Sequence, residues 1–166
     1  MNLMIVTAVW LTFVPSLLFG GQRPPIAASA APPLVGEWQL NVARTHYGPS
    51  VDRRRSERMS CAMVATELRC RIQSVRSDGR ELTGTFAAVP GGPGGPGAPV
   101  KGIPDIDEVR LQKPSATIID ATFLSRGNPA FGYRAFQSDD GRSLMIVSVY
   151  PDTGSVATTI VVYNRR

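Results

Sequence analysis

Few side chains in this sequence are suited to nucleophilic chemistry. His46 is the only histidine among 166 residues, so any Ser/His/Asp arrangement would depend on it. It lies between Thr45 and Tyr47 in a polar segment, and the chain has no Gly-x-Ser-x-Gly motif. We therefore interpret His46 as an exposed loop residue rather than a general base.

Two pairs of carboxylates are the other candidates for chemistry. Asp105 and Asp107 are spaced to share one face of a strand, whereas Asp139 and Asp140 precede Gly141, as is typical of a turn. Neither pair is followed by the further oxygen ligands of a recognisable calcium site. We expect no catalytic residue, no metal site and no cofactor, and we interpret the protein as non-enzymatic.

Arginine is concentrated in one part of the chain. Eight arginines lie between residues 53 and 80, and they are Arg53, Arg54, Arg55, Arg58, Arg69, Arg71, Arg76 and Arg80. On neighbouring strands their outward members would form one basic face, with Arg53, Arg55 and Arg58 contacting anionic lipid or polysaccharide. The alternative is a charged strand surface that resists edge pairing. Nucleic acid is not expected, because no aromatic residues alternate with these arginines.

The N-terminal segment resembles an export signal. Residues 3–19 are almost wholly apolar, and no charged residue precedes Arg23. With the small residues Ala28-Ser29-Ala30 as a cleavage site, we predict a signal peptide over 1–30 and a linker over 31–35. The protein would then be periplasmic or secreted. The alternative is a membrane anchor formed by the same segment left uncleaved.

The two cysteines, Cys61 and Cys70, are the only ones in the chain. An even number of cysteines in an exported protein favours a disulfide, and the eight residues between them fit a hairpin. Two buried thiols are the alternative. A zinc site is not expected, since this spacing and a single histidine do not provide four ligands.

The elements that position these residues are short segments of alternating polarity separated by turn residues. This pattern predicts an all-β, antiparallel, up-and-down meander of eight to nine strands, closed into a barrel over residues 36–166. We expect strands over 36–41, 53–61, 68–75, 81–89, 105–111, 117–125, 131–137, 143–150 and 155–163. The segment 143–150 is so apolar that we expect it to be covered on both faces. Residues 90–102, PGGPGGPGAPVKG, are expected to be a disordered loop.

The interior of such a barrel is either filled by side chains or able to hold one small ligand. Large aromatic residues at inward positions are the candidates for contact with a small apolar ligand, namely Trp38, Phe86, Phe123, Phe131 and Tyr133. Gly84 lies on the same face as Phe86 and is expected to mark a bulge or a bend. For Trp38 a packed structural role is an alternative to ligand contact.

The opening GEWQLNVARTHY of residues 36–47 resembles the first strand of a family of uncharacterised exported bacterial proteins that are lipocalin-like. Three later segments are similar to the same family, PDIDEVRL at 104–111, SDDGRSL at 138–144 and VYNR at 162–165. The cysteine pair and the enlarged Gly/Pro loop depart from its pattern. The resemblance implies a lipocalin-like barrel and export, and it implies that Trp38 packs against Arg165 or Arg166. It transfers no catalytic residue.

Overall fold

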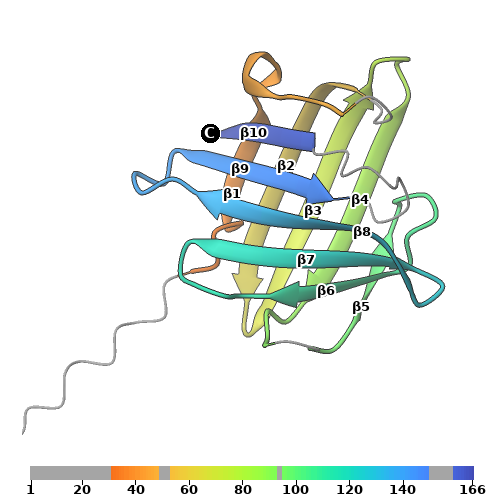
Figure 1. Cartoon of the computed structure of the whole chain (residues 1–166), viewed down its shortest axis with the longest axis vertical. Helices are drawn as coiled ribbons and strands as arrows, with labels where there is room; N and C mark the ends of the chain where they lie inside the picture. Colours follow the sequence, from red (N-terminus) through yellow and green to blue (C-terminus); the bar gives the residue numbers. More distant parts are fainter. Residues whose placement is uncertain (1–30, 49–52, 93–94, 150–158) are drawn as a thin grey trace, which may run out of the picture.

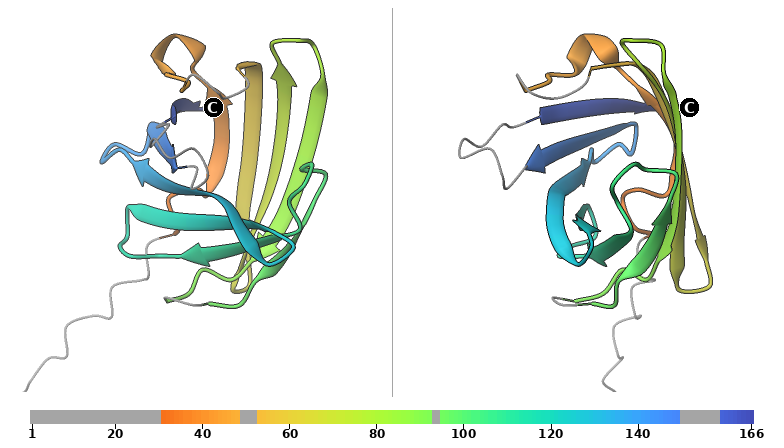
Figure 2. Two further views of the ribbon diagram at one scale, coloured as in Figure 1. Left: turned by 45° about the vertical axis from the view of Figure 1, so that its right-hand side comes forward. Right: turned by 90° about the vertical axis from the view of Figure 1, so that its right-hand side faces the viewer.

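The computed structural model describes residues 31–48, 53–92, 95–149 and 159–166, and in this part of the chain ten antiparallel strands form a closed barrel. The strands follow one another around the barrel in chain order, and the last pairs with the first. The predicted up-and-down meander is therefore confirmed, with one strand more than expected. The strands of residues 54–88 form one wall, and those of residues 118–149 cross in front of them at a steep angle (Figures 1 and 2).

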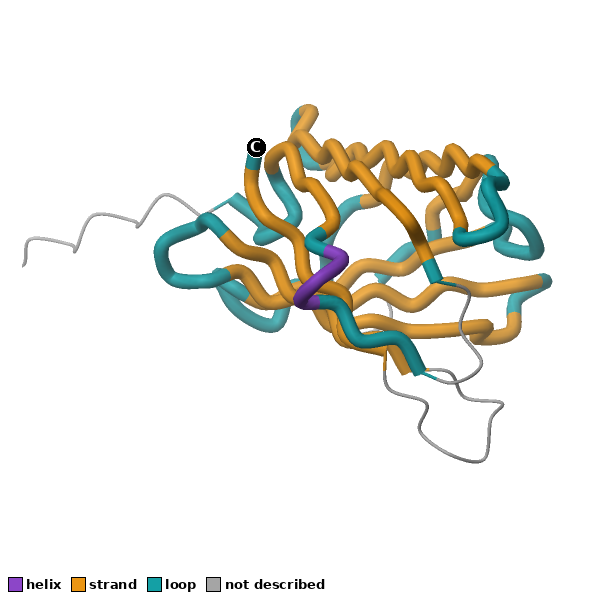
Figure 3. Tube along the Cα trace, turned by 90° about the horizontal axis from the view of Figure 1, so that it is seen from above, coloured by secondary structure: helices purple, strands orange, loops and turns teal. Residues whose placement is uncertain are grey.

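The strands are β1 (Gly36–Leu40), β2 (Arg54–Val64), β3 (Glu67–Arg76), β4 (Glu81–Ala88), β5 (Ala98–Lys101), β6 (Glu108–Gln112), β7 (Ile118–Ser125), β8 (Asn128–Gln137), β9 (Ser143–Val149) and β10 (Thr159–Arg165). One 3-10 turn, η1 (Val42–Arg44), follows β1 and contacts β10 and β2 (Figure 3). The described residues contain no α-helix.

Alternation determines which side chains enter the barrel. In β3, for example, Leu68, Cys70 and Ser74 are buried while Arg69 and Arg71 are exposed. The same alternation holds in β9, where Leu144 and Ile146 are buried. The expectation that this segment is covered on both faces is wrong, because its Met145 is 39% exposed on the outer surface. A closed single-layer barrel buries one face only.

The tenth strand, β5, lies in the segment that we expected to be disordered. That expectation is wrong for Ala98–Lys101, which pairs with β4 on one side and β6 on the other. Each pairing joins only two residue pairs, and Val100 supplies a buried side chain. The Gly/Pro-rich composition disfavours a strand here. Without β5, however, the edges of β4 and β6 would be unpaired, and their backbone groups supply the hydrogen-bonding partners that composition alone does not show.

The expected linker over 31–35 is also wrong, since most of it is packed at one end of the barrel. Pro33 and Leu34 are fully buried, and the Leu34 carbonyl accepts a hydrogen bond of 2.8 Å from the Trp38 indole N–H. The Arg165 guanidinium lies over the face of the Trp38 ring, 5.3 Å from its centroid. Trp38 is itself fully buried, so the expected packing of this tryptophan against Arg165 is observed.

The disulfide between Cys61 and Cys70 is present and joins directly opposed residues of β2 and β3. Both cysteines are 4% exposed and belong to the core. The pairing expected from the sequence is therefore confirmed.

Replacing both cysteines by alanine is expected to lower the free energy of unfolding by about 2–3 kcal/mol, since the bond closes a short loop in the unfolded chain. Urea unfolding followed by circular dichroism measures the change. The oxidised and reduced wild-type protein should differ by a similar amount, which separates the crosslink from the lost packing. An unchanged midpoint on reduction would contradict the prediction.

Candidate functional site

The site begins with an irregularity in β2. Its register with β3 shifts between Arg54 and Ser56, which is a β-bulge. Without the bulge, strict alternation from the inward Cys61 would place Arg55 inside the barrel and Arg54 outside. With it, Arg54 and the buried Glu57 both face the interior while Arg55 is exposed.

Polarity falls with depth along the inner face of β2 and β3. Reading the register from one end of the barrel, Arg54 is opposite Arg76, Glu57 is opposite Ser74, and Met59 is opposite Ile72. The disulfide forms the next level. The barrel therefore has one end at which charged groups face inward and an interior that becomes apolar.

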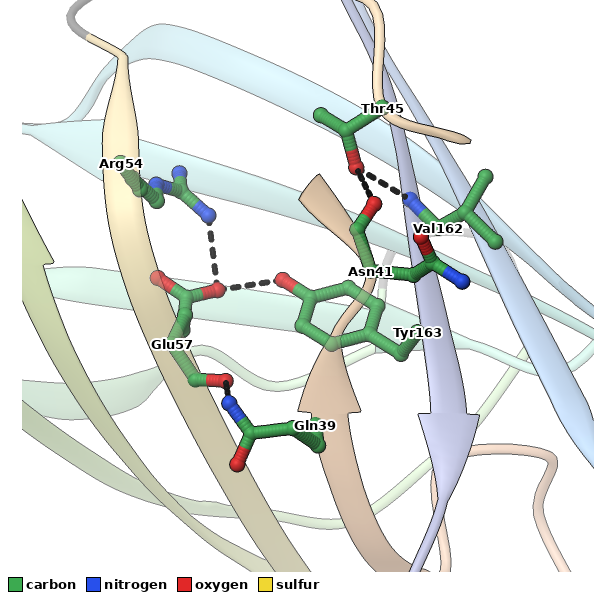
Figure 4. A network of polar contacts seen from close by, with 7 residues as sticks. All are labelled: Gln39, Asn41, Thr45, Arg54, Glu57, Val162 and Tyr163. Carbon is green, nitrogen blue, oxygen red and sulfur yellow. Dashed lines mark hydrogen bonds and ion pairs between the residues drawn. The ribbon is translucent and has the colours of Figure 1, made fainter. Parts of the chain in front are cut away.

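Glu57 is the centre of a buried polar cluster (Figure 4). Its side chain is 4% exposed, and one carboxylate oxygen accepts a hydrogen bond of 2.7 Å from the Arg54 guanidinium and another from the Tyr163 hydroxyl. The Glu57 backbone carbonyl accepts from the Gln39 side chain at 3.0 Å. A buried carboxylate is costly unless it is paired and hydrogen-bonded, and these donors meet that requirement.

A cavity of about 590 Å³ lies between this cluster and the packed core. Its polar lining comprises Arg54, Glu57, Ser74, Arg76, Ser148 and Tyr163. Its apolar lining comprises Met59, Ile72, Leu82, Ile103, Pro104, Ile106, Phe123, Phe131, Tyr133, Ile146 and Val161. The volume is within the range of protein sites that hold a single small molecule.

One wall of the cavity is the connection between β5 and β6, which folds inward. Its Ile103 lies against Gly84, where a Cβ atom would come within 2.6 Å of the Ile103 side chain. The register of β3 with β4 is regular through Gly84, so the expected bulge is absent from this pairing. Glycine is needed at position 84 because the Ile103 side chain occupies the space that any larger side chain there would need.

Aromatic residues join the core to the cavity. The ring of Phe123 stacks on Phe131 at 4.6 Å, and it lies 5.6 Å from Tyr133 and 6.0 Å from Phe86. Of the five predicted ligand-contact residues, the structure therefore brings Phe123, Phe131 and Tyr133 to the cavity wall. Trp38 and Phe86 lie in the packed core and do not line the cavity.

The tyrosines around Glu57 are held in the neutral form. Burial is the main cause that raises the pKa of Tyr163, Tyr133 and Tyr47, and the nearby negative charge of Glu57 raises each of them further. The Tyr47 hydroxyl is buried and makes no hydrogen bond to another described residue. All three phenols are therefore neutral at neutral pH, and the Tyr163 hydroxyl donates to Glu57 in this form.

The raised pKa values predict unfolding in alkali. The folded pKa values of these tyrosines lie above the unfolded value of 10.0. The stability that the buried neutral tyrosines contribute is therefore complete below pH 10 and is lost as the pH rises further. Each tyrosine steepens the fall by up to about 1.4 kcal/mol per pH unit. Urea unfolding at pH 9 and pH 11 tests this, and Tyr163→Phe should show a shallower fall. Equal stability at the two pH values would contradict it.

The arginines divide into groups that the sequence did not separate. Arg53, Arg55 and Arg58 are exposed, as expected for a basic face. Two others, Arg69 and Arg80, form ion pairs with Glu67 and Asp78, and Arg54 and Arg76 line the cavity. The sequence did not lead us to predict that Arg54 and Arg76 face inward. For Arg76 the signal was present, because it has the same parity in its strand as the inward Cys70.

The candidate groups for catalysis or metal binding remain dispersed. His46 is exposed, and its backbone bridges to Ile160. The Asp107 carboxylate accepts a hydrogen bond of 2.8 Å from the backbone N–H of Arg126, which follows β7. The Asp140 carboxylate accepts one of 3.0 Å from the backbone N–H of Arg142 in its own turn. Among the described residues, no group of three or more His, Cys, Asp and Glu side chains is placed to hold a metal ion.

The described residues include no helix that is long and apolar enough to cross a membrane. No family model matches the sequence, and no curated protein matches it. Among solved structures the chain is similar to a de novo designed fluorescence-activating β-barrel, with a TM-score of 0.41 and 12% identity over 80% of this chain and 93% of that chain. The assignment as a ten-stranded barrel rests on the strand pairing of this chain itself.

Proposed function

We propose that this protein is an exported, non-enzymatic, lipocalin-like barrel that holds one small, largely apolar molecule in its interior. The observation that carries the proposal is the cavity of about 590 Å³, with its predominantly apolar lining. Sites for small molecules are concave and mostly apolar, with a few polar groups that orient the ligand. The packing of Arg165 on Trp38 supports the lipocalin-like part of the proposal.

The proposed export is supported by two features. The apolar segment over residues 3–19 has the composition of a secretory signal. The Cys61–Cys70 disulfide belongs to the kind of bond that persists in oxidising compartments. The proposed location is therefore the periplasm or the extracellular medium.

Blocking the cavity should abolish binding of an apolar probe. Ser74 is 7% exposed and faces the cavity, so Ser74→Phe places an aromatic ring in the binding volume. We expect its affinity for the neutral fluorophore N-phenyl-1-naphthylamine to fall at least tenfold relative to wild type. Fluorescence titration measures the affinity, and circular dichroism establishes that the variant is folded.

The matched control is Gln73→Phe, which adds the same ring at an exposed position of the same strand. Its affinity should equal that of wild type. Wild-type protein that fails to bind the probe would contradict the proposed function, as would a folded Ser74→Phe variant that binds normally.

The second candidate function is docking on an anionic lipid or polysaccharide surface. It is favoured by the exposure of Arg53, Arg55 and Arg58, none of which forms an ion pair with another described residue. Such binding should be strongly salt-dependent. Co-sedimentation with anionic vesicles that persists unchanged in a triple serine variant at these positions would remove this candidate.

A further inference from the structure

A serine hydroxyl in the cavity wall has no hydrogen-bond partner among the described residues. Ser148 in β9 is only 8% exposed, and its side chain lines the cavity. Its register partner in β10, Thr159, differs, because the Thr159 hydroxyl accepts a hydrogen bond of 3.1 Å from the Gly48 backbone N–H. A buried hydroxyl that stays unbonded costs free energy, so we expect its partner to come from outside the described chain.

A second hydroxyl lies on the same wall. Tyr133 in β8 is directly opposite Ser148, and both side chains line the cavity. The Tyr133 hydroxyl likewise makes no hydrogen bond to another described residue. The Tyr133 ring lies 5.6 Å from Phe123, which stacks on Phe131 at 4.6 Å. This wall of the cavity therefore combines two hydroxyl donors with a flat aromatic surface.

Two hydroxyls that can both donate suit an oxygen that can only accept. A carbonyl oxygen has two lone pairs and no proton, so it can accept from both groups at once. Burial, and then the negative charge of Glu57, raises the pKa of Tyr133, so its phenol keeps the proton that it would donate. The same negative charge disfavours an anionic acceptor at this position.

The other buried serine of the described lining is less suited to this role. Ser74 is 7% exposed and lies directly opposite Glu57. Directly opposed side chains are within reach of each other, so the Ser74 hydroxyl can turn toward the Glu57 carboxylate. Its strand, β3, is also not adjacent to β7 and β8, which supply the stacked phenylalanines.

We infer that the molecule held in the barrel is a flat, uncharged, largely apolar compound with a carbonyl oxygen that accepts hydrogen bonds from Ser148 and Tyr133. This inference rests on the proposed function and names the class of its ligand. Ser148 is then a specificity-determining residue. Its hydroxyl selects the carbonyl group and adds nothing to the stability of the ligand-free protein.

The test uses two rigid probes of nearly equal shape, 9-fluorenone and fluorene, which differ by a carbonyl group in place of a methylene group. Each is used to displace N-phenyl-1-naphthylamine from the protein at neutral pH. We expect fluorenone to bind about fivefold more tightly than fluorene, or better, although fluorene is the more hydrophobic of the two. In Ser148→Ala and in Tyr133→Phe this preference should shrink at least threefold, with the affinity for fluorene unchanged.

The matched control is Ser74→Ala, which removes the other buried serine hydroxyl of the lining and should retain the full preference. A second measurement separates binding from stability. Without any probe, Ser148→Ala should unfold at a urea concentration no lower than wild type, because its hydroxyl makes no hydrogen bond to another described residue. A lower midpoint would show that the hydroxyl stabilises the fold and would contradict the inference.

Equal binding of fluorenone and fluorene by wild type would overturn the inference, as would an unchanged preference in Ser148→Ala. Either result leaves the proposed function standing, because N-phenyl-1-naphthylamine still binds. If N-phenyl-1-naphthylamine itself does not bind to wild type, the proposed function fails and the inference fails with it.

Discussion

Replacing Trp38 by alanine is expected to lower the free energy of unfolding by about 3–5 kcal/mol, the range for removing a large aromatic side chain from a core. Trp38 has no exposed surface, and it fills one end of the barrel between Leu34 and Arg165. Its removal leaves a void and also frees the Leu34 carbonyl. For a domain whose total stability is of the order of 5–15 kcal/mol, this is a large fraction.

Urea unfolding followed by far-ultraviolet circular dichroism measures this loss without depending on tryptophan fluorescence. Trp38→Phe is the matched variant, because it retains an aromatic ring but lacks the indole N–H that donates to Leu34. We expect it to lose about 1–2 kcal/mol for the missing hydrogen bond and volume. A Trp38→Ala variant as stable as Trp38→Phe would show that this end of the barrel is not a packed core.

The second large effect is expected at Gly102, where alanine should cost about 3 kcal/mol. Its φ is +74°, a conformation that residues with a Cβ rarely adopt, and a Cβ atom would overlap the backbone carbonyl oxygen of Thr83. Thr83 is in β4, so the overlap falls where the β5–β6 connection turns into the barrel. A backbone oxygen in a paired strand cannot move aside cheaply.

Gly79 separates the cost of the positive φ from the cost of the overlap with Thr83. It also has a positive φ, +88°, but a Cβ atom there would meet nothing within 4 Å. Gly79→Ala should therefore cost only about 1 kcal/mol, the conformational part alone. Chemical unfolding of both variants gives the comparison. Equal losses at the two positions would mean that the contact with Thr83 contributes nothing.

The alternation of side chains was enough to predict nine of the ten strands and, for most of them, the face that packs in the core. It failed where tertiary contacts override composition. Leu34 follows two prolines and reads as a linker, yet Trp38 and the end of the barrel bury it. In the same way, the edges of β4 and β6 recruit Ala98–Lys101 from a Gly/Pro-rich segment.

The candidate site was predicted only in part, for a related reason. Phe123, Phe131 and Tyr133 were identified because large aromatic residues at inward parity are visible in the sequence. Arg54 was not identified as inward, because a one-residue bulge reverses its parity and nothing in the sequence marks the bulge. The inward position of Glu57 was available from its spacing to Cys61, but its pairing with Tyr163 depends on closure of the barrel.

The pairing of β1 with β10 also sets an order on folding. The β2–β3 hairpin is local, with cysteines only nine residues apart, whereas Trp38 meets Arg165 across almost the whole described chain. Local hairpins form in microseconds, and contacts between distant segments form later. Tyr163 belongs to β10 and can contact Glu57 only after β10 has closed the barrel. We therefore expect the β2–β3 hairpin to form first and the cavity to be assembled last. Occupation of the cavity would then report that folding is complete.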